Sequence, residues 1–242
     1  MQIIPAIDIR DGHCVRLLYG DYDAETRYDV DPVERAKYYA SIGLAHLHIV
    51  DLDGARDGTP RNAELIERMV SASGVSVQVG GGIRTAVHIQ TLLDHGVERV
   101  VIGSTAVKQP ELVVEWFAHF GASRIVLALD VRFDNDGQPL VTTDAWQSTS
   151  AVTLNDLIDQ YLPAGLRHVL CTDISRDGAL SGPSIELYRT TLARYPQLQL
   201  QASGGVSSIE DLAALRDAGL PAAITGKALL EGKITAEQLV AC

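Results

Sequence analysis

The chain has 242 residues, of which 46% are hydrophobic and 21% charged, as in an ordinary globular protein. Its formal net charge of −11 and the absence of a Lys/Arg cluster argue against nucleic-acid binding. No stretch approaches the roughly 18 apolar residues that a membrane helix needs, and the N-terminus lacks the features of a signal peptide.

Short runs rich in β-branched residues alternate with amphipathic segments along the chain. The predicted strands span 2–8, 46–51, 75–79, 98–102, 124–130, 167–171, 198–202 and 221–225. Predicted helix N-caps follow them, at Asp31 before Pro32 and at Thr85, Thr153, Ser184 and Ser207. Glycines suited to left-handed C-caps end the helical segments, at Gly43, Gly96, Gly165 and Gly219.

Eight strands, each followed by a helix, predict parallel pairing through right-handed crossovers. An open doubly wound sheet is the alternative. The strand count in a chain of 242 residues, and the match between two sets of four βα units, favour a closed barrel. We therefore expect α/β architecture, with a single (β/α)8 TIM barrel over 1–242 and a twofold half-barrel repeat of about 1–121 and 122–242.

The repeat is visible as paired motifs at nearly one offset. Asp8 in IIPAIDIR matches Asp130 in IVLALDVR, with 130 − 8 = 122. The Gly81-Gly82 turn matches Gly204-Gly205, with 204 − 81 = 123, and Gly103 matches Gly226, with 226 − 103 = 123.

Both diglycine turns stand between a strand and a helix. Without side chains there, a phosphate can approach the backbone, and the helix N-terminus adds N–H groups and a positive dipole end. The next strand ends, Gly103-Ser104 and Gly226-Lys227, complete two corners. Tight turns alone could explain one such pair, but two predict a substrate with a phosphate at each end. We expect side chains added at Gly82 or Gly205 to weaken substrate binding more than folding.

Asp8 and Asp130 end apolar strands, at the barrel edge that holds catalytic groups. The first and fifth strands are opposite in an eight-stranded ring, so the two carboxylates should face each other as one base and one acid. The alternative is that each carboxylate only pairs with a neighbouring cation, Arg10 or Arg132.

Further polar residues follow the second and sixth strands: Asp51, Thr172, Asp173 and Asp177. They could bind sugar hydroxyls, support the acid and base, or organise turns. His46 and His48 form an HxH pair, which is a weak metal signal without a third ligand, so we expect no metal. No P-loop, GxGxxG, GxSxG or HExxH motif occurs, which argues against nucleotide hydrolases, dehydrogenases and serine hydrolases.

Two connections are unusually long, 9–30 after the first strand and 131–152 after the fifth. Loops of this length are commonly functional lids. Arg16, Tyr19, Tyr22 and Trp146 could cover a ligand from them, although surface decoration is the alternative. The three cysteines, Cys14, Cys171 and Cys242, form no CxxC pair and predict a reducing, cytoplasmic location.

Over nearly its whole length the chain resembles the phosphoribosylformimino-5-aminoimidazole carboxamide ribotide (ProFAR) isomerases of histidine biosynthesis. The segments that carry the resemblance are IIPAIDIRDGHCVRLLYGDY, HLHIVDLDGA, VQVGGGIR, VVIGSTAV, LALDVR, CTDISRDGALSGP, ASGGV and ITGKALLEG. The resemblance implies an Amadori rearrangement of an N-linked aminoaldose to an aminoketose, with no cofactor or metal. It also implies a small-molecule bisphosphate substrate, and we expect a monomer.

In that family, the aspartate matching Asp8 is the base that removes the C2 proton. The aspartate matching Asp130 is the general acid that opens the ribose ring, and Asp177 is a rival for that role. Thr172 matches a position that assists. We expect the substrate to be bound by Gly81, Gly82, Arg84, Gly103, Ser104, Gly178, Gly204, Gly205, Gly226, Lys227, Trp146, Arg16 and His48.

Two alternatives to this function stay open. A bifunctional branch also isomerises phosphoribosylanthranilate, but its motif after the third strand tends to read SGGIR, where this chain has GGGIR at 80–84. A non-catalytic phosphosugar-binding barrel is the second alternative. Carboxylates at Asp8 and Asp130 argue against it, because they would repel a dianionic ligand without any catalytic benefit.

Overall fold

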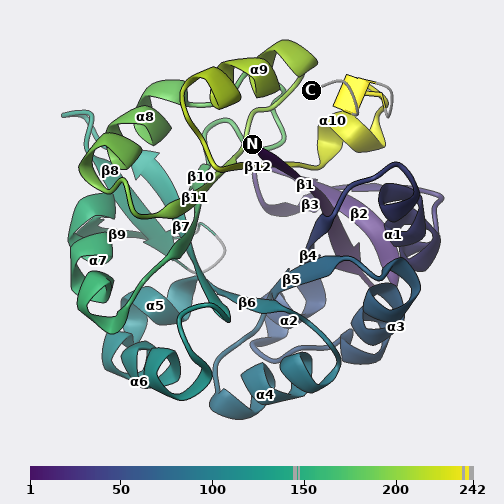
Figure 1. The fold of residues 1–242 in the computed structure, drawn as a ribbon, viewed down its shortest axis with the longest axis horizontal. Helices are drawn as coiled ribbons and strands as arrows, with labels where there is room; N and C mark the ends of the chain where they lie inside the picture. The colour runs from purple at the N-terminus through teal and green to yellow at the C-terminus, as the bar shows by residue number, and fades with distance from the viewer. Residues whose placement is uncertain (144–145, 147, 236–237, 240–242) are drawn as a thin grey trace.

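A computed structural model describes residues 1–143, 146, 148–235 and 238–239. In these ranges eight parallel strands close into a barrel, since β7 pairs with β10 at the end of the series β10-β11-β12-β1-β4-β5-β6-β7 (Figure 1). The barrel strands are β1 (Gln2–Arg10), β4 (His46–Asp51), β5 (Ser76–Gly80), β6 (Arg99–Ile102), β7 (Ile125–Phe133), β10 (His168–Asp173), β11 (Gln199–Ser203) and β12 (Ala222–Thr225). The predicted (β/α)8 barrel is confirmed, and the open sheet is excluded.

The helices surround the barrel (Figure 1). The longer ones are α1 (Pro32–Ser41), α3 (Ala63–Ser73), α4 (Ala86–Asp94), α6 (Pro110–Phe120), α7 (Leu154–Tyr161), α8 (Ile185–Arg194) and α9 (Ile209–Asp217). Shorter segments are α2 (Leu52–Asp57), α5 (Ser104–Lys108), η1 (Leu162–Ala164) and α10 (Lys227–Leu230). Their apolar faces pack on the strands in one core, which includes Met69 of α3 and Leu92 of α4. No helix in the described ranges is long and apolar enough to cross a membrane.

Side-chain capping explains where several of the helices begin. Asp31 accepts hydrogen bonds from the N–H groups that follow it, and Thr85 and Thr153 cap α4 and α7 in the same way, as predicted. Ser184 lies at the N-cap of α8 but makes no side-chain capping bond, because its hydroxyl donates to Asp173 instead.

The cap predicted at Ser207 was wrong by one residue. Ser208 begins α9 in a capping box with Asp211, while Ser207 donates to the Asp211 carboxylate from outside the helix. The glycines predicted as left-handed C-terminal residues all have positive φ, between 83° and 90°: Gly43, Gly96, Gly165 and Gly219.

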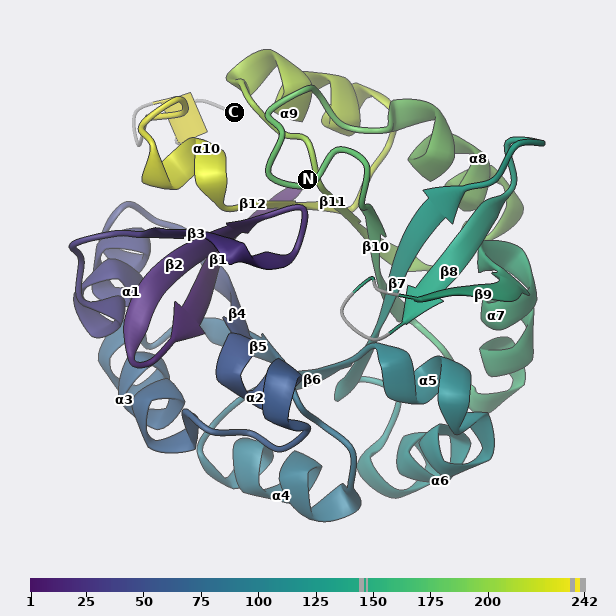
Figure 2. The same cartoon turned by 180° about the vertical axis from the view of Figure 1, so that it is seen from behind.

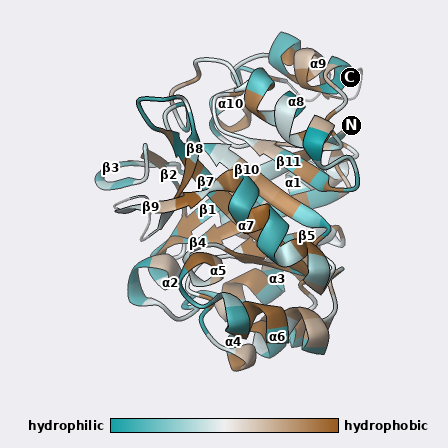
Figure 3. Ribbon diagram, turned by 90° about the vertical axis from the view of Figure 1, so that its left-hand side faces the viewer, coloured by the Kyte–Doolittle hydropathy of each residue, from teal (hydrophilic) through white to brown (hydrophobic). Residues whose placement is uncertain are grey.

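The two long connections form β-hairpins rather than irregular loops. β1 runs past the barrel and pairs with β2 (His13–Leu18), which pairs in turn with β3 (Asp21–Arg27). In the same way β7 pairs with β8 (Pro139–Thr143), which pairs with β9 (Ser148–Thr153). The hairpins lie on opposite sides of one barrel mouth, away from the N-terminus (Figures 2 and 3). Residues 144–145 and 147 of the second connection, and Cys242, lie outside the described residues.

Strand register repeats between the two halves of the barrel. Ala6 pairs with His48 in the β1–β4 ladder, and Ala128 pairs with Leu170 in the β7–β10 ladder, with 128 − 6 = 122 and 170 − 48 = 122. The other barrel ladders repeat at 122 or 123 in the same way. This regularity supports our proposal that the single domain consists of two half-repeats of about 1–121 and 122–242.

Candidate active site

A cavity of about 300 Å³ lies at the barrel mouth that carries the hairpins. Strand ends and both hairpins line it. All of the catalytic and substrate-binding residues expected from the family resemblance contribute to its wall: Asp8, Arg16, His48, Gly81, Gly82, Arg84, Gly103, Ser104, Asp130, Trp146, Thr172, Asp177, Gly178, Gly204, Gly205, Gly226 and Lys227. Residues far apart in the sequence therefore share one concave site, as expected for the carboxyl ends of barrel strands.

Asp8 is buried at the end of the barrel part of β1 and is bound by Arg16. Arg16 stands on β2, and its Nη1 donates to Asp8 Oδ2 at 2.9 Å. Its Nη2 lies 2.5 Å from both carboxylate oxygens of Asp177. Burial raises the pKa of Asp8, Arg16 lowers it, and the nearby charge of Asp177 raises it. One guanidinium therefore links two of the predicted catalytic carboxylates.

Asp130 faces neutral donors. Trp146 donates through its Nε1 to Asp130 Oδ2 at 2.9 Å, and Thr172 pairs with Asp130 across the β7–β10 ladder. Burial raises the pKa of Asp130, while hydrogen bonds from Trp146 and Thr172 lower it. Burial is the largest of these effects, so the pKa of Asp130 lies above its ordinary value and the protonated form is favoured more than in water.

The alternative that Asp8 and Asp130 merely pair with Arg10 and Arg132 is wrong. Arg10 donates to Glu25 and to the Tyr22 carbonyl instead. Arg132 donates to Thr149 and, at 3.5 Å, to the Trp146 carbonyl.

Trp146 has a backbone conformation that large residues rarely adopt, with φ of 71°. Its indole lies against Gly20 of the other hairpin, where an added Cβ would come within 2.6 Å of the ring. The hairpins therefore meet above the mouth. Strain of this kind persists only where surrounding contacts impose it and is common at functional sites.

Gly82 and Gly205 have positive φ, and each packs against a neighbouring loop. A Cβ at Gly82 would overlap the carbonyl of Gly54, and one at Gly205 would overlap the carbonyl of Gly182. Substitution there would therefore disturb the fold, which corrects our expectation that binding would suffer more than folding.

The other half of each corner is more open. Gly103 begins α5 and Gly226 begins α10, both without a side-chain cap. A Cβ at Gly103 would have no neighbour closer than 3.9 Å, and one at Gly226 none closer than 3.4 Å. Lys227 crosses from the second corner to donate to the Gly178 carbonyl at 2.9 Å.

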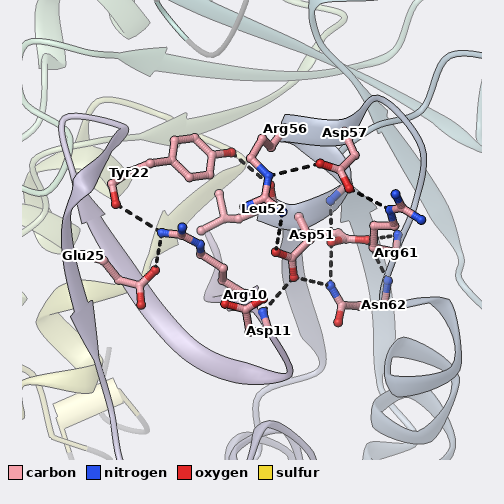
Figure 4. Close-up of polar contacts among 12 residues, drawn as sticks. Arg10, Asp11, Tyr22, Glu25, Asp51, Leu52, Arg56, Asp57, Arg61 and Asn62 are labelled. Carbon is pink, nitrogen blue, oxygen red and sulfur yellow. Dashed lines mark hydrogen bonds and ion pairs between the residues drawn. The ribbon is translucent and has the colours of Figure 1, made fainter.

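The first hairpin is tied to α2, the short helix that directly follows β4 (Figure 4). Tyr22 donates through its hydroxyl to the Leu52 carbonyl at 3.0 Å, and the Asp11 N–H donates to Asp53 at 2.7 Å. Tyr22 lines the cavity. Tyr19, predicted to cover a ligand, is instead 52% exposed and is not among the residues that line it.

Asp51 and Asp173 organise turns. Asp51 is fully buried and accepts from the N–H groups of Gly54, Arg61 and Asn62, and from the Asn62 side chain (Figure 4). Asp173 accepts from the N–H and hydroxyl of Ser175 and from the Ser184 hydroxyl. Neither is among the residues that line the cavity. Of the roles left open for these two residues, the structure supports the organisation of turns.

His48 is buried in the cavity floor, and its Nδ1 lies 3.1 Å from Gln78 Nε2. Burial and the positive charge of Arg16 lower its pKa to about 4. His46, two residues earlier, is not among the residues that line the cavity. In the part of the chain that the structure describes, no three His, Cys, Asp or Glu residues are grouped so as to hold a metal ion.

Sequence reasoning did not single out Gln78 and Gln201. They hydrogen-bond to each other inside the barrel. The available signal was a glutamine in the middle of an apolar strand in both halves, in VQVG at 77–80 and LQAS at 200–203, with 201 − 78 = 123.

The chain matches known proteins along its length. The sequence model of a family described as histidine biosynthesis protein matches residues 2–235. A protein of Citrobacter koseri is 52% identical over 241 residues, which is 100% of this chain and 98% of that protein. Proteins of Aliivibrio fischeri and Klebsiella pneumoniae are 50% and 51% identical with the same coverage. All three are named as isomerases of an imidazole-4-carboxamide whose name carries two 5-phosphoribosyl groups.

Proposed function

The chain belongs to the histidine biosynthesis protein family, and on that premise we propose that it isomerises ProFAR, an imidazole-4-carboxamide with two phosphoribosyl groups, to the aminoketose PRFAR. The observation that carries the proposal is one cavity lined by Asp8, Asp130 and both glycine corners. The relatives that are half identical over the full chain carry the name of this isomerase.

The reaction moves protons and leaves both phosphates intact. Asp130 gives a proton to the ribose ring oxygen as the bond from that oxygen to C1 breaks, and the nitrogen lone pair forms a C1–N double bond. Asp8 then removes the C2 proton, which gives an enol amine that tautomerises to the ketone. A positioned acid or base of this kind contributes typically 10²–10⁴-fold to the rate.

We assign the acid role to Asp130 rather than to Asp177. Arg16 occupies both carboxylate oxygens of Asp177, whereas the hydrogen bonds to Asp130 come from Trp146 and Thr172. Burial raises the pKa of Asp130, in the direction that a proton donor requires. Asp177 then acts through Arg16, which it holds beside Asp8.

Gly81, Gly82, Gly103 and Ser104 form one phosphate corner, and Gly204, Gly205, Gly226 and Lys227 form the other. Both line the same cavity, so they suit the two ends of one substrate. Trp146 and Arg84 line the same cavity, which supports the proposal that they contact the substrate, with the indole stacking on the aminoimidazole. Binding of both phosphates would favour a closed, water-excluded site.

We further propose that the enzyme works in the cytoplasm as a monomer, on a small-molecule substrate and without metal or cofactor. Cys14 and Cys171 are buried free thiols, as suits a reducing compartment. Light scattering on the purified protein tests the monomer directly.

The decisive assay offers ProFAR and phosphoribosylanthranilate to one preparation. Phosphoribosylanthranilate has a single phosphate and can fill only one corner, so we expect strong activity on ProFAR and little or none on the second compound. Comparable catalytic efficiencies would place the chain in the bifunctional branch. Binding of ProFAR without turnover would make it a phosphosugar-binding barrel.

A further inference from the structure

A polar group lies inside an otherwise apolar layer of the barrel. Gln78 of β5 and Gln201 of β11 are each 4% exposed. The apolar side chains packed in the barrel interior are Ile4, Ala6, Val101, Val126, Leu170, Ala222 and Ile224. Burying an amide is costly unless its donors and acceptors are paired, so these glutamines need a specific reason.

Gln78 and Gln201 satisfy each other. Gln78 Nε2 donates to Gln201 Oε1 at 2.7 Å, and Gln201 Nε2 donates back to Gln78 Oε1 at 3.0 Å. This reciprocal pair couples the orientations of the two amides, because turning one amide alone would oppose two donors and two acceptors.

The two glutamines have different neighbours in the two half-barrels. Gln78 pairs with His48 in the β4–β5 ladder, while Gln201 pairs with Leu170 at the equivalent place between β10 and β11. The remaining N–H of the Gln78 amide faces His48 Nδ1 at 3.1 Å. With the amides in this orientation, the Gln78 nitrogen donates, so Nδ1 accepts and the imidazole proton is on Nε2.

His48 lines the cavity. Some polar atoms of the described residues are fully buried without a hydrogen-bond partner, and His48 Nε2 is not one of them. The charged group that acts on His48 is Arg16 of β2, which is itself bonded to the carboxylates of Asp8 and Asp177. A pKa of about 4 keeps the imidazole neutral at neutral pH.

We infer that Gln78 is a positioning residue that holds His48 as a neutral imidazole with its proton on Nε2, and that Gln201 fixes the Gln78 amide for this purpose. His48 then donates a hydrogen bond to an oxygen of the bound sugar phosphate. The sugar-phosphate oxygen as acceptor rests on the proposed function. The tautomer of His48 does not depend on it.

The test is long-range ¹⁵N–¹H NMR of the imidazole in the ligand-free protein at neutral pH, with the His48 signals assigned from a His48→Gln variant. We expect a single neutral tautomer with the proton on Nε2. A proton on Nδ1 would mean that both amides face the other way, and it would overturn the inference whatever the enzyme acts on.

Two variants separate positioning from packing. Gln78→Met and Gln201→Met remove equally buried side chains, so a purely structural role predicts similar losses of stability and no change at His48. We expect Gln78→Met to give a mixture of tautomers and about tenfold lower kcat/KM on ProFAR, the effect of one hydrogen bond. Gln201→Met should move the tautomer ratio less. An unchanged tautomer in Gln78→Met contradicts the inference, and if that variant does not fold, the spectrum of the unaltered protein still decides.

Discussion

Arg16 and Asp8 are joined by a hydrogen bond of 2.9 Å between Nη1 and Oδ2 inside the cavity. Burial alone would favour the neutral carboxylic acid at Asp8, which cannot act as a base. The guanidinium opposes this effect and favours the ionised carboxylate, although burial remains the larger influence. The first hairpin therefore contributes to the chemistry as well as to the cover of the site.

Replacing Arg16 by Met should make Asp8 harder to ionise. Arg16 lowers the pKa of Asp8, so its removal raises that pKa, and the acidic limb of the kcat/KM profile should move to higher pH. We expect kcat/KM at neutral pH to fall roughly 10- to 100-fold, because a charged hydrogen bond contributes about 1.5–3 kcal/mol. Arg27→Met, on β3 of the same hairpin and 47% exposed at its side chain, is the control and should leave the limb in place. An unmoved limb in Arg16→Met argues against Asp8 as the base.

Trp146→Phe should affect the opposite limb. The indole hydrogen bond lowers the pKa of Asp130, so without it that pKa rises and Asp130 keeps its proton to higher pH. We expect the basic limb of the pH profile to move upward, with kcat/KM about tenfold lower at neutral pH. A basic limb that stays in place, or moves to lower pH, is incompatible with Asp130 as the acid.

Four glycine-to-alanine variants divide phosphate binding from folding. Gly103 and Gly226 have room for a methyl group, so alanine there should leave the melting temperature nearly unchanged and raise KM. Gly82 and Gly205 face carbonyl oxygens at positive φ, so alanine there should lower the melting temperature. Thermal unfolding and kinetics on all four variants check this. A normal KM in Gly103→Ala or Gly226→Ala would mean that the corner with that glycine does not bind a phosphate of the substrate.

Asp51→Ala should cost stability. It leaves the N–H groups of Gly54, Arg61 and Asn62 without the fully buried carboxylate that accepts from them, so we expect a loss of about 3 kcal/mol or more in the free energy of unfolding. Asp57→Ala, which removes only surface pairs with Arg56 and Arg61, should change stability little. Urea titration measures both. Equal losses in the free energy of unfolding would mean that the hydrogen bonds to Asp51 stabilise the fold no more than the surface ion pairs of Asp57 do.

Most of this architecture could be predicted from the sequence because local patterns determine it. Apolar runs, and the glycines between them, predicted both ends of each barrel strand to within about three residues. The hairpins could not be predicted in the same way. β3 reads DYDAETR, which is polar and partly exposed, and it is a strand only because it pairs with β2.

The composition of the site was predictable, whereas its contacts were not. Strand-end aspartates and paired glycine turns pointed to the cavity. The bridge from Arg16 to Asp177 joins residues 161 apart in the sequence, and the contact between Trp146 and Gly20 joins the two hairpins. Such contacts depend on how the ring closes, which no local pattern records.

Turnover of ProFAR by Asp8→Asn, measured beside the unaltered enzyme, decides whether this barrel isomerises ProFAR with Asp8 as its base. Asparagine keeps the shape of the side chain but cannot take a proton. We expect a folded variant that still binds ProFAR and whose turnover is lower by a factor of about 10²–10⁴. Near-normal turnover by Asp8→Asn, or no turnover of ProFAR by the unaltered protein, would contradict this assignment.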